Sequence, residues 1–584
     1  MNTVAVLLVS IACLAAGYIF YGGWLAKQWG VDEKKKTPAV EMEDDVDYVP
    51  TKTPVLMGHH FSSIAGAGPI NGPIQAAVFG WVPVLLWVLL GGIFMGGVHD
   101  FGALFASLRN KGHSIGEIIS DTMGQKAKRL FLVFAYLTLI LVIAAFGSIV
   151  ASTFGTTKMD GSAVAEPTLS ANLSTAMISI LFIVLAVIVG QLMYRVHMKV
   201  LPASLIGVVG IVGIIALGLN WHPVALTYNT WMWVVGAYII VAAVLPVWML
   251  LQPRDYLSSF LLYFMIAASI VGVIGSAVKG GANVDIPAFT GWTANVDNGL
   301  FASGTMFPAL FVTIACGAVS GFHSLVSSGT TSKQLDNEKH ARPVAYGSML
   351  IESVLAVVSL CAIGYVWKDA YDGKFAAPTQ VFATGVSTML GSFTSEAVQK
   401  VMYQMLILAI SVFCLTSLDT CARLARYMFQ EFWLKEGEDV KDVKGARAIL
   451  VNPWFATILT VVAGITLGMT GYTKIWPLFG AANQLLAAVG LLAVCAWLGS
   501  VGRNNKMFYF PMMFMLVVTC TSLLQTIIKK FTALAAGFDG WALAQAFIAI
   551  FLVALAVDLA VMTIVTLFKQ HSAKADAAET KKAA

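Results

Sequence analysis

The stretch His59–Gln75, which reads HHFSSIAGAGPINGPIQ, interrupts a long apolar region of the chain. In a helix interior, glycine costs about 1 kcal/mol and proline about 3 kcal/mol relative to alanine, so this composition predicts a helix that is broken in its middle. Within the hydrocarbon of a membrane, a broken backbone is tolerated only where protein encloses it or where it lines a wet cavity. Membrane transporters hold substrates and coupling ions at such breaks. The stretch therefore predicts an enclosed polar site within a membrane bundle.

Composition places the chain among polytopic membrane proteins. Of its 584 residues, 58% are hydrophobic and only 11% are charged, which excludes a soluble globular protein of this length. The basic residues are scattered over short loops, which argues against nucleic-acid binding. The seven cysteines lie in apolar segments without CxxC spacing, so we expect neither a disulfide framework nor a zinc or iron–sulfur site.

Fifteen apolar stretches are long enough to cross roughly 30 Å of hydrocarbon, which takes about 20 helical residues. They are Val4–Ala26, Val55–Phe79, Trp81–Leu108, Leu130–Phe154, Asn172–Met193, Val200–Leu219, Thr230–Leu251, Leu257–Val278, Thr305–Ser328, Pro343–Trp367, Ala397–Phe429, Pro453–Thr470, Ile475–Leu498, Phe508–Ile528 and Trp541–Phe568. If the N-terminus is outside, the inner segments hold every arginine and most of the lysines, as the positive-inside rule requires. We therefore predict an all-α polytopic membrane protein of about fifteen transmembrane helices, with its N-terminus outside and its C-terminus inside.

Five sequence words span nearly the whole hydrophobic chain. They are GHHFSSIAGAGPINGPIQAAVFGWVP (Gly58–Pro83), GGVHDFGALFASLRNKGHSIGEI (Gly96–Ile118), QPRDYLSSF (Gln252–Phe260), GAVSGFHSLVSSGTTSKQL (Gly317–Leu335) and TSLDTCARLARY (Thr416–Tyr427). These words resemble the carbon-starvation protein A family, which consists of inner-membrane transporters induced when carbon is scarce. Some members take up pyruvate with protons, and others are implicated in peptide uptake. Better-known members carry additional C-terminal segments, so this chain resembles a short form.

The resemblance implies a multi-pass protein of the bacterial inner membrane that is a secondary active transporter and not an enzyme. It implies a small-molecule substrate and a coupled proton or sodium ion, with no cofactor, no metal and no nucleic-acid partner. We expect symport of small, pyruvate-like organic carboxylates under carbon starvation. Uptake of short peptides is the alternative, and transport of divalent metal ions is a further one. The substrate, the coupling ion, the oligomeric state and metal binding by the histidines stay open.

The family is grouped with transporters that share a LeuT-like core of five-plus-five inverted repeats with discontinuous helices. This grouping implies an extra helix and cytoplasmic loop in residues 1–54, a ten-helix transport core in residues 55–429, a cytoplasmic loop and four additional helices in residues 430–568, and a cytoplasmic tail in residues 569–584. Val55–Phe79 is then core helix one. Thr230–Leu251, which is interrupted by prolines near its end, is expected to be core helix six, because this choice needs no insertion. Thr305–Ser328, rich in glycine and serine, is the alternative.

Candidate substrate-binding residues surround the predicted breaks. Glycine lets the backbone approach a substrate, and the N–H groups at the start of a half-helix favour a carboxylate. Nearby polar side chains add hydrogen-bond donors, and an arginine just after a break could reach a carboxylate. The candidates are Ser62, Ser63, Gly66, Gly68, Asn71, Gln75, Gln252 and Arg254. Helix packing through small residues is the alternative interpretation of the glycines.

Candidate coupling or gating residues are mostly titratable groups inside apolar stretches, where a charged group is costly and usually functional. They are His59, His60, His99, Asp100 and His323. His59 and His60 diverge by about 100° on a helix, so they cannot both face one ligand. Asp100 and His323 are the strongest candidates to carry a coupled proton.

Two further patterns predict polar contacts. Ser320 and Ser324 lie on one helix face, and by analogy with inverted-repeat transporters they are candidates for a cation site. Asp419 and Arg423 have the i,i+4 spacing of an ion pair on a helix.

Overall fold

The computed structural model describes residues 1–583 except residues 167, 295, 297–298, 436–437 and 439. The described chain is mostly helical, with one short antiparallel sheet of β1 (Thr293–Ala294) and β2 (Gly304–Thr305). The helices are α1 (Thr3–Ala16), α2 (Gly23–Trp29), α3 (Pro38–Glu41), α4 (Thr53–Ile64), α5 (Gly68–Ala76), α6 (Trp81–Gly91), α7 (Gly97–Arg109), α8 (Ile115–Met123), α9 (Gln125–Phe154), α10 (Thr168–Gly190), α11 (Val200–Asn220), α12 (Tyr228–Val244), α13 (Leu251–Val278), α14 (Met306–Thr313), α15 (Gly321–Gly329), α16 (Ser348–Tyr365), α17 (Trp367–Tyr371), α18 (Pro378–Gly391), α19 (Glu396–Trp433), α20 (Ala446–Leu450), α21 (Pro453–Gly468), α22 (Tyr472–Ser500), α23 (Tyr509–Ala536) and α24 (Gly540–Ala583).

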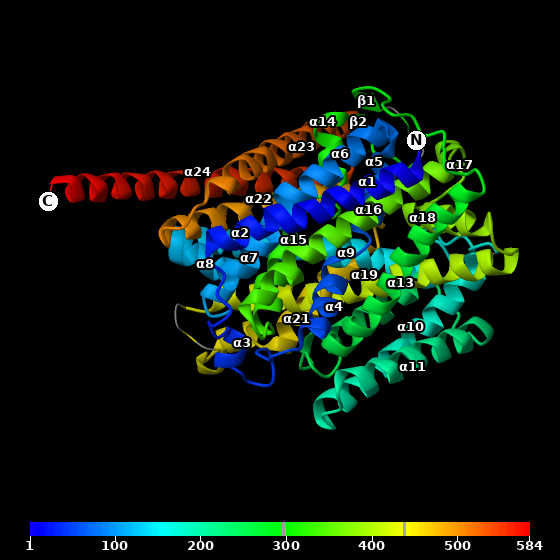
Figure 1. The fold of residues 1–584 in the computed structure, drawn as a ribbon, viewed down its shortest axis with the longest axis horizontal. Coiled ribbons are helices and arrows are strands. Elements are labelled where there is room, and N and C mark those ends of the chain that lie inside the picture. Colours follow the sequence, from blue (N-terminus) through cyan, green and yellow to red (C-terminus); the bar gives the residue numbers. More distant parts are fainter. Residues whose placement is uncertain (167, 295, 297–298, 436–437, 439, 584) are drawn as a thin grey trace.

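The helices form one bundle, with the pair α10 and α11 at one edge (Figure 1). α24 packs along α23 and continues beyond the bundle (Figure 1). α9 packs along α19, while α22 packs against α7, α9 and α15. The most apolar part of α22 is 100% buried, so this helix lies inside the bundle. The predicted domain boundary at residue 429 lies between α22 and the helices α7, α9 and α15, although α22 packs against all three.

Eleven helical stretches in the described part of the chain are long and apolar enough to cross a membrane. α12 and α21 are apolar but shorter. The two remaining predicted stretches, Val55–Phe79 and Thr305–Ser328, are each divided into shorter helices. All fifteen predicted stretches thus contain helix, while the number of helices that cross the bilayer and the orientation stay predictions.

The predicted break in His59–Gln75 is confirmed. α4 ends at Ile64, and α5 begins at Gly68 with Pro69 in its first turn, where the missing N–H costs no helical bond. A second interruption separates α14, which ends at Thr313, from α15, which begins at Gly321. Residues 65–67 and 314–320 therefore form two non-helical links inside apolar surroundings.

The stretch Thr230–Leu251 differs from its prediction as an interrupted helix. α12 ends at Val244, and Leu251 already begins α13. Pro253 lies in the first turn of α13, where a proline is tolerated. Gln252 and Arg254 therefore open a new helix instead of following a break.

The loop between α2 and α4 is tied to the segment that follows α15. The backbone N–H groups of Val49 and Thr51 donate to the carbonyls of Lys333 and Gln334, at 3.1 and 2.9 Å. The Nζ of Lys333 lies 5.2 Å from the ring centre of Tyr48, within cation–π range. The loop thus packs against the end of α15.

Asp47 anchors the same loop to α19. Its Oδ1 accepts a hydrogen bond from the Tyr427 hydroxyl at 2.6 Å and lies 3.6 Å from the Nη1 of Arg423. Burial disfavours the charged form of Asp47, but the positive charges of Lys333 and Arg423 outweigh it and hold the pKa of Asp47 below its usual value.

We predict that Asp47→Asn loosens this loop. Because folding lowers the pKa of Asp47, its stabilisation is present above the unfolded-state pKa and is lost as the pH falls through the folded-state pKa. At neutral pH, limited proteolysis followed by mass spectrometry should show several-fold faster cleavage between α2 and α4 in Asp47→Asn than in wild type. The exposed control Glu43→Gln should be cleaved at the wild-type rate. Equal rates for Asp47→Asn and wild type would contradict the prediction.

Candidate functional site

The two helix breaks lie against each other inside the bundle. A Cβ on Gly68 would lie 2.4 Å from the Sγ of Cys316, and a Cβ on Gly72 would lie 2.8 Å from the carbonyl oxygen of Thr313. Any larger residue at either position would require these neighbours to shift. The first turns of α5 are therefore in direct contact, through glycine, with the end of α14 and with the second link.

The residues predicted to line the first break have different surroundings. Side chains lie in front of both predicted glycines, because Gly68 faces Cys316 and a Cβ on Gly66 would lie 2.6 Å from the ring of Phe146. The amide group of Asn71 is fully buried, and neither its nitrogen nor its oxygen has a hydrogen-bond partner. Gln75 is partly exposed and lines a cavity of about 300 Å³ at the far end of α5. In this conformation the glycines pack, and Asn71 is the polar group that lacks partners.

Asp255, at the start of α13, brings three of the predicted residues together. Its Oδ2 lies 2.7 Å from the Nδ1 of His59 and accepts a hydrogen bond from the Ser63 hydroxyl at 3.1 Å. The Ser62 hydroxyl donates to the carbonyl of Asp255 at 2.9 Å. The Ser63 hydroxyl also lies 3.2 Å from that of Thr420 on α19. The last two turns of α4 are thus held by a buried carboxylate.

Arg254 forms a second buried group beside Asp255. Its Nη1 contacts the Oδ2 of Asp419, and the Tyr238 hydroxyl donates to the same oxygen at 2.7 Å. The Nη2 of Arg254 lies 3.8 Å from the Oδ1 of Asp255, which joins the two groups. Among the described ion pairs, Asp419 therefore pairs with Arg254 on α13 and not, as predicted, with Arg423 on its own helix. Arg423 instead bonds to the backbone after α12.

Two predicted residues lie outside these groups. The Nε2 of Gln252 donates to the Thr51 hydroxyl at 2.8 Å and to the Oε1 of Gln334 at 2.6 Å, so Gln252 fastens the loop before α4. The Nδ1 of His60 lies 2.8 Å from the Thr331 hydroxyl just after α15. The adjacent histidines His59 and His60 therefore face different partners, as their helical geometry predicts.

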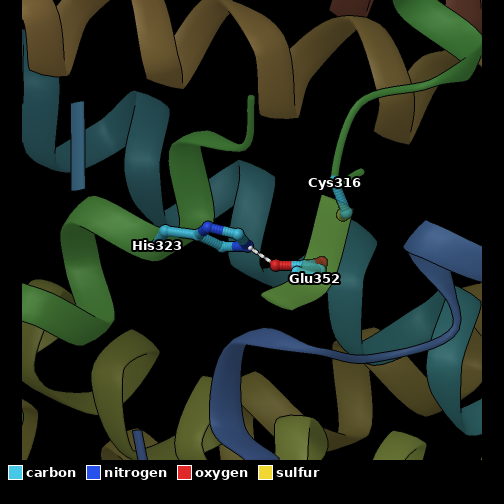
Figure 2. A group of neighbouring side chains, drawn as sticks. All are labelled: Cys316, His323 and Glu352. Carbon is cyan, nitrogen blue, oxygen red and sulfur yellow. Dashed lines mark ion pairs between the residues drawn. The ribbon is translucent and has the colours of Figure 1, made fainter. Parts of the chain in front are cut away.

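Asp100 joins α7 to α15. Its Oδ1 lies 2.8 Å from the Nδ1 of His99, and its Oδ2 lies 2.8 Å from the Nδ1 of His323. The other ring nitrogen of His323, Nε2, points toward Glu352 on α16, with its Oε2 at 3.4 Å (Figure 2). All four side chains are fully buried. Asp100 and His323, the two strongest coupling candidates, therefore meet.

The hydroxyls of the predicted cation site, Ser320 and Ser324, have other hydrogen-bond partners in this conformation, and the cation site stays a prediction. The Ser320 hydroxyl accepts a hydrogen bond from the Nδ2 of Asn483 on α22 at 3.0 Å. The Ser324 hydroxyl donates to a carbonyl of its own helix at 2.8 Å. The hydroxyl that donates to the end of α4 comes from α19, where Ser417 bonds the carbonyl of Ser63 at 3.1 Å.

Sequence reasoning missed three residues of these groups as site residues. Glu352 carried a usable signal, since it is a carboxylate within an apolar stretch, but it lies outside the family words. Asp255 lies within a family word, directly after Arg254, but the sequence does not indicate which helix its carboxylate faces. Cys316 carried no signal, because its neighbours in space are distant in sequence.

Solved transporter structures resemble the chain distantly. The structure of MhsT in complex with L-phenylalanine is 12% identical with a TM-score of 0.49, and covers 88% of this chain and 99% of that chain. A mutant of the manganese transporter of Eremococcus coleocola is 10% identical with a TM-score of 0.48, and covers 91% and 99% of the respective chains.

Sequence comparisons identify the family. The family model described as carbon starvation protein CstA matches residues 2–374 and 373–522. The peptide transporter CstA of Campylobacter jejuni is 33% identical over 88% of this chain and 79% of that protein. The pyruvate/proton symporter BtsT of Escherichia coli K12 is 30% identical over 88% of this chain and 80% of that protein. The chain therefore belongs to the carbon starvation protein CstA family.

Proposed function

We propose that the protein is a secondary active transporter that imports small organic carboxylates of the pyruvate class together with protons. The observation that carries this proposal is that α5 and α15 both begin at the two breaks that touch each other. The start of a helix carries roughly half a positive elementary charge, and its free N–H groups bind anions. The start of α5 touches the second break through Gly68 and Cys316, whereas Gly321 at the start of α15 lies against Asn483 and Ala487 of α22. The start of α5 therefore favours a small anion at the contact between the breaks. The relative named as a pyruvate/proton symporter supports the same class of substrate.

The side chains at this place fit a small polar substrate. No side chain caps the N-terminus of α5. Pro69 has no N–H, and the N–H groups of Ile70 and Asn71 donate to the carbonyl of Ala67. The N–H of Gly68 is therefore the one at this helix start left to bind a ligand. Asn71 lies in the first turn of α5 and offers an amide without partners. At α15, by contrast, Asn483 already accepts a hydrogen bond from the N–H of Phe322 at 2.9 Å. We therefore propose that the substrate carboxylate binds at the start of α5.

We place the coupled proton at the pair His59 and Asp255. The pair is fully buried at the end of α4, and neither the Nε2 of His59 nor the Oδ1 of Asp255 has a hydrogen-bond partner. A proton that neutralises Asp255 weakens its hold on Ser63 and on Arg254, and so links proton binding to movement of α4. The groups that face the pair are Ser63, Arg254 and, beyond them, Asp419. Proton transfer by Asp100 or His323 stays a prediction.

The contact between the two breaks also supports a proposal for which stretch is core helix six of the inverted repeat. Thr305–Ser328 is core helix six, because its break touches the start of α5 in Val55–Phe79, whereas the non-helical residues of Thr230–Leu251 form the connection between α12 and α13. α11 and α12, between α10 and α13, are then the insertion that this arrangement requires. We propose that the protein lies in the bacterial inner membrane, as its bacterial relatives suggest.

Short peptides are the second candidate substrate, because several relatives are named peptide transporters. Purified protein in proteoliposomes should accumulate labelled pyruvate when an inward proton gradient is imposed, and should do so less with sodium alone. Unlabelled dipeptides should not compete. Accumulation of dipeptide without accumulation of any small carboxylate would overturn the carboxylate proposal in favour of peptides.

We predict that Gly68→Leu lowers uptake by about tenfold or more, since overpacking of this kind costs about 1–3 kcal/mol and falls on the contact between the breaks. The matched control is Gly213→Leu on α11, where a Cβ would have nothing within 4 Å. Uptake rates and size-exclusion profiles should be measured for both variants. Wild-type uptake by Gly68→Leu would show that close approach of the breaks is not needed for transport.

We predict that Asp255→Asn loses accumulation driven by a proton gradient but keeps exchange of labelled for unlabelled substrate, which needs no net proton movement. Asp369→Asn on α17 removes a surface carboxylate and serves as the matched control. Normal accumulation by Asp255→Asn under a pH gradient would exclude the pair His59 and Asp255, and would leave Asp100 and His323 as the residues to test.

A further inference from the structure

Cys316, His323 and Glu352 come together from three parts of the fold (Figure 2). Cys316 lies in the link between α14 and α15, His323 in the first turn of α15, and Glu352 on α16. A sulfur, an imidazole nitrogen and a carboxylate oxygen from these residues lie within 4.8 Å of one another, and all three side chains are buried. The three donor types are those that bind transition metals in proteins.

Asp100 orients the histidine of this group. It lies 2.8 Å from the Nδ1 of His323, which leaves Nε2 as the nitrogen that faces Glu352. The other oxygen of Asp100 is held by His99 at 2.8 Å. A carboxylate bonded to the far nitrogen of a histidine is the usual support of a metal-binding histidine, because it fixes the ring and raises its basicity.

Glu352 lacks the partners that a buried carboxylate needs. Neither of its oxygens has a hydrogen-bond partner, and among the described residues its ion pair is with His323. Asp100 brings a further carboxylate to the same place, and its ion pairs in the described chain are with His99 and His323. A buried carboxylate without a strong counter-charge is costly. A divalent cation between Glu352, His323 and Cys316 would supply that charge.

We propose that Cys316, His323 and Glu352 bind a divalent transition metal ion of the zinc class, with Asp100 and His99 as the supporting groups. The mixed sulfur, nitrogen and oxygen donors favour zinc-like ions over magnesium or calcium. Three protein ligands leave a fourth position for water or another small ligand. The Cys316 thiol gives up its proton to solvent when it binds, as a thiolate ligand must.

The site needs only a small adjustment to close on an ion. Metal–ligand bonds of about 2.0–2.3 Å require the donor atoms to approach by roughly 1 Å from their present spread. Cys316 can supply this movement, because it lies in the non-helical segment 314–320. A bound ion would tie that segment to α16 and so order the second break. The metal site does not depend on whether the transported substrate is a carboxylate or a peptide.

The first test uses cobalt as a spectroscopic probe on full-length protein purified in detergent without a polyhistidine tag. Titration with Co²⁺ should give about one bound ion per chain, visible bands of four-coordinate cobalt and a near-ultraviolet thiolate-to-cobalt band. Zn²⁺ should displace the cobalt and raise the Tm. Wild-type protein that shows no thiolate-to-cobalt band would overturn the proposal.

Variants then assign the ligands. Cys316→Ser should lose the thiolate band, whereas Cys361→Ser, a second buried cysteine located on α16, should keep it. Asp100→Asn should keep the band but bind cobalt about 10- to 100-fold more weakly, as loss of a supporting group does. A thiolate band that persists in Cys316→Ser would show that the metal binds elsewhere.

X-ray absorption of zinc-loaded wild-type protein decides the point even if Cys316→Ser does not fold. One Zn–S contact of about 2.3 Å beside nitrogen or oxygen contacts of about 2.0 Å is expected. A shell of nitrogen and oxygen alone would exclude Cys316 as a ligand and overturn the site.

Discussion

A helix that is interrupted inside hydrocarbon must find partners for its free backbone groups within the protein, and this constraint organises the fold. Side chains of other helices supply several of these partners, since Trp87 donates to the carbonyl of Ile314 and Ser417 to that of Ser63. The two interrupted helices also pack against each other. Gly72 of α5 lies against the carbonyl of Thr313 at the end of α14, and Gly68 lies against Cys316 in the second link. Because larger side chains would separate these segments, the glycines that break the helix also let the two breaks touch.

Polar groups gather around both breaks, and different helices supply them. Asp255 on α13 holds the end of α4, and Arg254 connects it to Asp419 on α19. On the other side, Asp100 on α7 reaches His323 at the start of α15. Each buried charge has an opposite or titratable neighbour, as burial demands. Movement of either half-helix would have to rearrange one of these groups, which is how binding and conformation become coupled in this proposal.

The sequence predicts the features that depend on local composition. Glycines and prolines in His59–Gln75 mark the first break, and Asp100 stands out as a carboxylate in an apolar stretch. Contacts between helices are different, because spacing along one helix does not encode them. The i,i+4 pattern pairs Asp419 with Arg423, whereas a residue of another helix, Arg254, takes that place in the structure.

The same limit explains why the sequence places Leu251 in the wrong helix and why Cys316 and Glu352 are absent from the predicted site. Prolines near the end of an apolar stretch resemble an interruption, but a proline is equally compatible with the first turn of the next helix, where Pro253 lies. Cys316 gains its neighbours only when the second link folds against α16. Sequence patterns therefore predicted the first helix break. The contact between the two breaks became visible only in the folded structure.

The central claim is that the substrate binds where the two breaks meet. The most direct measurement is an electron cryomicroscopy map of the wild-type protein in lipid nanodiscs with saturating pyruvate, compared with a map without it. The account predicts ligand density next to Asn71, at the start of α5. Ligand density confined to another cavity, such as the one lined by Ser152 and Tyr228, would contradict it.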